Sequence, residues 1–158
     1  MTMILDGSAG VTFPNSTVQA SAGSVIQVVN ATYSTQASTT STSFVDTGLT
    51  ATITPKFSTS KILVMYEING TYSSLAAGTQ VNLCRGSTQL IINEKITSRV
   101  GLGTTDAGTG TSGATYLDSP ATTSATTYKC QFSTNTGSTA YAQFSSSVST
   151  ITLMEIAQ

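Results

Sequence analysis

The side chains that most often carry out catalysis are scarce in this chain. There is no histidine, and only six Lys and Arg residues and seven Asp and Glu residues occur among 158 positions. A serine nucleophile needs a neighbouring base, which is usually histidine. A glycosidase needs two carboxylates held in one cleft. Six of the acidic residues are the candidates for such a pair, and each stands alone in the sequence: Asp46, Glu67, Glu94, Asp106, Asp118 and Glu155. The sequence therefore predicts that the protein is not an enzyme. It is expected to act by binding, without turnover and without a cofactor.

The two cysteines, Cys84 and Cys130, each lie in a run typical of a strand. Neither has a second cysteine or a histidine at ligand spacing, so no metal site is expected. Two interpretations of the pair stay open. They are either buried free thiols that behave as small apolar side chains or the two halves of a cross-strand disulfide.

The composition excludes several classes of partner. Only 8% of the residues are charged and the net charge is −1, while about a third of the chain is Ser or Thr. There is no basic stripe, so nucleic-acid binding is not expected. The longest apolar runs, at 61–66 and 89–92, are too short to cross a bilayer, and no secretory signal is expected at the N-terminus. The 39% of hydrophobic residues are grouped into runs of strand length, which indicates a folded chain.

The positions of these side chains must be set by strands, because no window has the apolar period of a helix. Residues 49–54, for example, alternate between apolar and polar and end at Pro55. About eight such runs separated by short turns predict an all-β, antiparallel β-sandwich of jelly-roll-like form. The alternation predicts a core that contains Val25, Val29, Leu49, Ile53, Ile62, Val64, Leu83, Ile91, Phe132, Phe144, Ile151 and Leu153.

The first 23 residues form a separate arm in this interpretation, followed by a β-sandwich domain at 24–158. The arm has turn signals at Asp6-Gly7 and Pro14-Asn15. Strands this short cannot bury their apolar residues within one chain, because isolated hairpins are marginal in water. The arm is therefore expected to intertwine with copies of itself through Ile4, Val11, Phe13 and Val18.

Two stretches of the sequence resemble a known class of protein. The string DGSAGVTFPNSTVQ is similar to a motif in tail-fibre and other appendage proteins of tailed bacteriophages. The runs SVIQVVNATYSTQ, SFVDTGLTATITP, SKILVMYEING and STITLMEIA resemble a β-domain found in phage appendage proteins. The resemblance implies a homotrimer with a jelly-roll-like domain, joined through its arm to other virion proteins. It implies a virion location, with assembly in the host cytoplasm and release by lysis.

Three functions remain open at this point. The first is a tail fibre or fibre tip that attaches to the host surface by binding. The second is a capsid decoration or head-fibre knob protein, and the third is a cellular lectin-like adhesion module, which the N-terminal motif disfavours.

Two loops are candidates for contact with a host-surface glycan. The glycine-rich stretch 98–114 has little to bury, and long loops without structure of their own are usually functional or disordered. A mobile surface loop with no partner is the competing interpretation. The expected contact residues are Val100, Gly101, Leu102, Gly103, Thr104, Thr105, Asp106, Thr109 and Thr111. An alternate loop is expected at Tyr72, Ser73 and Ser74. Glu67, a lone charge in an apolar run, is expected to pair with a Lys or Arg, or with a neighbouring subunit.

Overall fold

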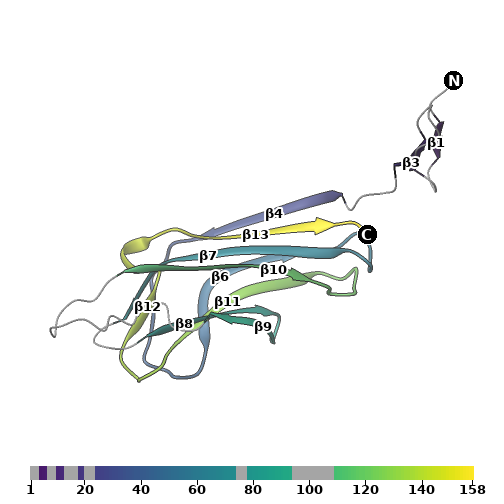
Figure 1. Cartoon of the computed structure of the whole chain (residues 1–158). Coiled ribbons are helices and arrows are strands. Elements are labelled where there is room, and N and C mark those ends of the chain that lie inside the picture. The colour runs from purple at the N-terminus through teal and green to yellow at the C-terminus, as the bar shows by residue number, and fades with distance from the viewer. Residues whose placement is uncertain (1–3, 7–9, 13–17, 20–23, 74–77, 94–108) are drawn as a thin grey trace.

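The structure is a computed structural model that describes residues 4–6, 10–12, 18–19, 24–73, 78–93 and 109–158 (Figure 1). Within these ranges every regular element is a strand, apart from one 3-10 turn, η1 (Phe144–Ser146). The all-β class predicted from the sequence is therefore confirmed.

The sandwich consists of two antiparallel sheets. The main strands of the first sheet, in pairing order, are β4 (Val25–Tyr33), β13 (Ser149–Ile156), β7 (Lys61–Ser73) and β10 (Gly110–Asp118). Two short strands extend this sheet from the last residues of β7, namely β12 (Ala140–Ala142) and β5 (Ala37–Thr39). The second sheet has the order β6 (Val45–Ile53), β11 (Thr126–Thr134), β8 (Thr79–Arg85) and β9 (Thr88–Asn93).

The path of the chain through these sheets is that of a jelly roll. From β4 the chain crosses to β6 in the second sheet, returns to β7, and crosses again to β8, which forms a hairpin with β9. It then alternates between the sheets through β10, β11 and β13. Eight main strands in two facing sheets, in the orders β4-β13-β7-β10 and β6-β11-β8-β9, are the arrangement of a double-sheet jelly roll.

Alternating side chains place one face of each sheet in the core. In β6 the side chains of Leu49, Ala51 and Ile53 are buried, while the residues between them are exposed. Full burial of a large apolar side chain stabilises the fold by about 1.5–3 kcal/mol. Ten of the residues predicted for the core are buried in it or pack against it: Val29, Leu49, Ile53, Ile62, Val64, Leu83, Ile91, Phe132, Ile151 and Leu153.

Two predicted core residues lie elsewhere. Val25 is 53% exposed, because it is the first residue of β4 and the register of β4 against β13 is irregular between Glu155 and Ile156. Phe144 is half-buried and lies on η1 and not on a strand, so it packs outside the core.

The limits of the two predicted binding loops also differ from the structure. The glycine-rich loop expected to reach residue 114 ends sooner, because β10 begins at Gly110. Gly113 lies within β10, where a Cβ atom would come within 2.7 Å of the carbonyl oxygen of Tyr66. Tyr72 and Ser73, expected in a loop, are the last residues of β7.

The N-terminal segment contains three short strands that pair with one another. These are β1 (Ile4–Asp6), β2 (Gly10–Thr12) and β3 (Val18–Gln19), and they form an antiparallel sheet in the order β1-β2-β3. Ile4, Val11 and Val18 belong to these strands, and Phe13 lies outside the described residues. The division into an arm at 1–23 and a sandwich at 24–158 stays a prediction.

Two polar clusters tie the strands together at buried positions. The carboxylate of Glu155 on β13 is fully buried and accepts hydrogen bonds from the side chain of Gln27 and from the backbone N–H groups of Lys56 and Phe57. Burial opposes its ionisation, but polar contacts to the carboxylate, from Ser60 as well as from these three groups, outweigh burial and lower the pKa of Glu155 below the ordinary 4.5.

The second cluster joins β8, β10 and β11. Arg85 Nη1 lies 2.8 and 2.7 Å from the two carboxylate oxygens of Asp118, which is buried. Tyr128 donates its hydroxyl to Asp118 Oδ2 at 2.6 Å. Burial, together with the nearby carboxylate, raises the pKa of Tyr128 far above its usual range.

Cys84 and Cys130 are free, buried thiols, in agreement with the first of the two interpretations. Cys130 pairs in register with Leu83, so its side chain shares the inner face of the second sheet with that of Leu83. Cys84, the next residue, points to the opposite face, where its Sγ donates to Asn82 Oδ1 at 2.9 Å. Because the two thiols lie on opposite faces of the sheet, they cannot form a disulfide with each other in this fold.

Candidate functional site

The sandwich has two distinct ends. At one end β4 begins and β13 finishes, and the backbone N–H of Ala157 donates to the carbonyl of Ser24 at 2.9 Å. At the other end lie the last residues of β7, the first residues of β10, and β12 with the η1 turn that follows it (Figure 1). We call this second region the far end.

Three aromatic side chains pack together at the far end. Tyr72 stacks on Phe144 with ring centroids 4.8 Å apart, and Tyr141 lies 5.4 Å from each of them, tilted to one and edge-on to the other. All three side chains are half-buried. The cluster is therefore a rigid apolar surface that remains partly open to solvent.

The backbone around this cluster has an uncommon conformation. Gln143, Ser145 and Ser146 have φ values of 53°, 55° and 60°, in the left-handed region that favours glycine. Each such residue costs of order 1 kcal/mol or more, and conformations of this kind concentrate at functional sites.

Specific contacts hold the turn in this shape. The side chain of Gln143 is fully buried. In the amide orientation that satisfies both its polar atoms, the oxygen accepts a hydrogen bond from Ser149 Oγ at 3.1 Å, and the nitrogen donates to the carbonyls of Thr47 and Ala142, each at 3.2 Å. The backbone N–H of Gln143 donates to the carbonyl of Asn69 at 3.0 Å. Ser147 Oγ donates to the carbonyl of Phe144 at 2.7 Å.

A shallow hollow of about 430 Å³ opens beside the turn. We call it the far-end hollow; it is lined by Asn69, Gly70, Thr109, Gly110, Thr111, Phe144, Ser145 and Ser147. Gly70 has a φ of +62°, and a Cβ atom there would lie 2.6 Å from the backbone nitrogen of Phe144. A glycine at this position therefore lets the η1 turn pack directly against β7.

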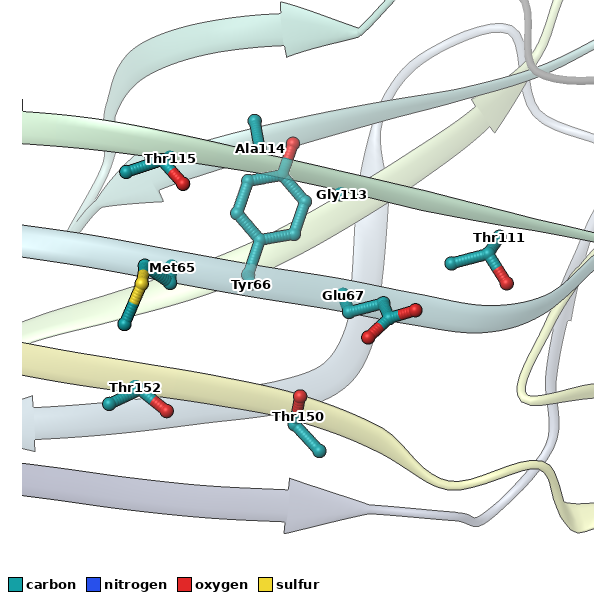
Figure 2. A pocket seen from close by; sticks show the side chains of 9 residues that line it. All are labelled: Met65, Tyr66, Glu67, Thr111, Gly113, Ala114, Thr115, Thr150 and Thr152. Carbon is teal, nitrogen blue, oxygen red and sulfur yellow. The ribbon is translucent and has the colours of Figure 1, made fainter.

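A second hollow, of about 460 Å³, lies on the outer face of the first sheet. Figure 2 shows Glu67 of β7 between Thr111 of β10 and Thr150 of β13. Gly113 is in register with Glu67 and has no side chain, which opens the hollow at this point. Thr111 lines both hollows, so the two are adjacent.

The same outer face carries a row of apolar side chains nearer the other end. Val28 is in register with Met154, Met154 with Leu63, and Leu63 with Leu117, so the row crosses all four main strands of the sheet. Val28 and Leu117 are 55% and 51% exposed, and the two residues between them are half-buried. We call this set the apolar row. Contiguous exposed apolar surface commonly marks an interaction site.

The structure brings together parts of both predicted loops. Thr109 and Thr111 line the far-end hollow, and Tyr72 supports its aromatic wall. Ser73 is buried at the end of β7. The other predicted contact residues lie outside the described residues: Val100, Gly101, Leu102, Gly103, Thr104, Thr105, Asp106 and Ser74.

The sequence interpretation missed several residues that shape the far end. Asn69, Gly70, Phe144, Ser145 and Ser147 all line the hollow, and none was singled out as a binding residue. The dipeptide Asn69-Gly70 is a turn signal within an apolar run, and it could have indicated a local distortion there.

Among the described residues that line these two hollows, Glu67 is the one charged side chain. Glu67 is exposed, and within the described ranges it makes no ion pair, so its predicted pairing with a neighbouring subunit stays a prediction. Asp46 pairs with Lys129 at 2.8 Å, and the hydrogen bond from Lys129 lowers the pKa of Asp46. The part of the chain that the structure describes contains no group of three or more potential metal ligands. It also contains no helix long and apolar enough to cross a membrane.

The fold defines the class of the domain as a double-sheet jelly roll, and the described residues that line the far-end hollow are uncharged. Comparison with known protein families and with curated proteins found no match. Among solved structures, the chain is similar to the crystal structure of the infectious bursal disease virus VP2 subviral particle, with a TM-score of 0.39 and 13% sequence identity. The match covers 84% of this chain, which spans 40% of the VP2 chain.

Proposed function

We propose that this protein is a structural component of a bacteriophage virion, a tail fibre or fibre tip, that attaches to the host surface by binding. The observation that carries the proposal is that the two ends of the sandwich differ. The segment that resembles phage anchoring arms leads into the sandwich at one end, and the far-end hollow with its aromatic wall lies at the other. Anchoring at the first end leaves the far end free to meet a surface.

The positions of the described carboxylates support binding without turnover. Asp118 is held by Arg85 and Tyr128, and Asp46 by Lys129. Glu155 is fully buried beneath the turn after β6. Glu67 is the remaining carboxylate whose side chain the structure describes, and no second acid is among the described residues that line its hollow. The paired acids of a glycosidase are thus not assembled in the described part of the chain.

The apolar row supports self-association. Exposed leucine, valine and methionine side chains in register across a whole sheet are costly in water. A second copy of this chain, equally apolar and equally poor in charge, is the partner whose surface matches. In the proposed homotrimer these rows face the neighbouring subunits, while the N-terminal arms join one another and the rest of the virion.

The proposal is tested on virions. Antibody labelling should locate the chain on tail fibres, and deletion of the gene should abolish adsorption to host cells. Removal of residues 1–23 should prevent incorporation into the virion while the circular dichroism spectrum of the sandwich is unchanged. Normal adsorption of virions that lack the protein would instead favour a capsid decoration or head-fibre knob.

A further inference from the structure

We propose that the far-end hollow is a carbohydrate site that takes one neutral sugar unit, with Phe144 as its apolar wall. This inference rests on the proposed function, since it names the ligand class and the residues of the surface that attachment would use.

The wall of the hollow suits the C–H face of a sugar ring. Binding pockets combine apolar or aromatic surface with a few fixed polar groups. Phe144 lines the hollow and stacks on Tyr72, while Tyr141 contacts both rings. Because these neighbours fix the ring of Phe144, little conformational entropy is lost when a ligand packs against it.

The polar groups around the wall are held in place and retain unused capacity. Asn69 Oδ1 accepts from Thr111 Oγ1 at 2.7 Å, and Asn69 Nδ2 donates to the carbonyl of Val148 at 2.8 Å. An amide oxygen has a second lone pair and an amide nitrogen a second hydrogen. Ser147 Oγ donates to the backbone and can still accept. Sugar hydroxyls both donate and accept, so they match this mixture.

The charges select a neutral ligand over an anionic one. No Lys or Arg is among the described residues that line the far-end hollow. The adjoining hollow, which shares Thr111, carries the exposed carboxylate of Glu67. An acidic sugar, such as a sialic or uronic acid, would meet repulsion from Glu67 and no compensating cation in this part of the site.

The turn that carries Phe144 is held in one conformation. The left-handed residues Gln143, Ser145 and Ser146 flank Phe144 in the chain, and the buried amide of Gln143 fixes their position. A site formed in advance, on a turn pinned to a strand, binds without a further ordering cost.

The test is NMR shift mapping of the full-length, ¹⁵N-labelled protein with single sugars as probes. D-galactose, D-glucose and N-acetylglucosamine are the neutral probes, and N-acetylneuraminic acid is the anionic comparison. At least one neutral probe should shift the backbone amides of Asn69, Gly70, Thr111 and Ser147. Phe144→Leu, which keeps an apolar side chain for folding, should weaken that probe's affinity by about fivefold. The matched control is Phe57→Ala, because Phe57 is 55% exposed in the turn between β6 and β7. Its affinity should equal that of the unchanged protein.

Three results would overturn the inference. These are no shift of the four amides by any neutral probe, tighter binding of the anionic probe, or shifts that depend on protein concentration and not on sugar, which would assign the hollow to a subunit contact. Virions separate this failure from failure of the proposed function. If deletion abolishes adsorption while Phe144→Leu virions adsorb normally, the site is wrong and the attachment role stands. If deletion leaves adsorption unchanged while the sugar shifts persist, the attachment role is wrong and the site stands.

Discussion

The carboxylate of Glu155 accepts the backbone N–H of Lys56 at 2.7 Å, although the two residues are 99 positions apart in the sequence. The bond pins the turn after β6 to the last strand of the first sheet. A charge at a fully buried position, satisfied by backbone and side-chain donors, makes the stability of the fold depend on its ionisation.

This dependence gives a prediction for pH. The pKa of Glu155 is lowered in the fold, so its stabilising effect is present above the unfolded value of about 4.5 and is lost as the pH falls through the folded value. Glu155→Gln should lower the free energy of unfolding at pH 7 by about 1–3 kcal/mol. The difference from the unchanged protein should shrink at pH 3. Urea denaturation at both pH values measures this, with the exposed Glu67→Gln as a neutral control. An equal difference at both pH values would contradict the prediction.

The two described ion pairs should differ in their contribution to stability. Asp118 is buried, so Arg85→Met leaves its carboxylate without a cation and should cost about 3 kcal/mol. Tyr128→Phe removes one buried hydrogen bond and should cost about 1 kcal/mol. The pair between Lys129 and Asp46 is more exposed, and Lys129→Met should cost less than about 1 kcal/mol. Chemical denaturation at one pH compares all three variants, and a larger loss for Lys129→Met than for Arg85→Met would refute this order.

Gly70 should be harder to replace than Gly86, although both have positive φ. Alanine at Gly86 meets no atom within 4 Å, so it should cost only the conformational penalty of about 1 kcal/mol. Alanine at Gly70 adds a clash with the backbone of Phe144 and should cost at least about 2 kcal/mol. Thermal unfolding of the two variants tests the difference. Equal melting temperatures of the two variants would show that the η1 turn can move away from β7 without a loss of stability, which would contradict the prediction.

The apolar row should control assembly and not folding. Leu117→Lys places a charge in the row, and sedimentation velocity should then show a smaller species, with the β-type circular dichroism spectrum retained. Ile92→Lys is the matched control, because Ile92 is an exposed apolar residue, 39% exposed, on β9 of the second sheet. If both variants sediment like the unchanged protein, the row is not a subunit contact.

The alternation of apolar and polar residues was sufficient to predict core residues where a strand has one solvent-exposed face and one buried face. The alternation of β6 predicted Leu49 and Ile53 in the core, and both are buried. The start of β10 could not be predicted in this way, because Gly110, Ser112 and Gly113 have neither apolar nor β-branched side chains. They are in a strand because β7 pairs with them along its length.

The sequence indicated Thr109, Thr111 and Tyr72 at the far end, but the turn that completes the hollow could not be predicted, for a different reason. Phe144 has a large apolar side chain like those of the core residues. Only the left-handed turn around it places the ring outside the core. Asn69 and Ser147 are far apart in the sequence and meet because Gly70 lets the turn approach β7. Local patterns carry no information on such contacts, which depend on tertiary packing.

The placement of the two thiols on opposite faces of the second sheet has a consequence for how the domain can be handled. Its folded form contains no covalent link between strands that a reductant could cut, and none that an oxidant could add within the chain. Dithiothreitol and air should therefore leave the melting temperature of the monomeric unit the same. Burial also raises the pKa of Cys130 well above its usual range, so its thiolate is scarce and alkylating reagents should modify it only when the sandwich opens. The rate of alkylation of Cys130 is therefore a measure of how often the jelly roll opens.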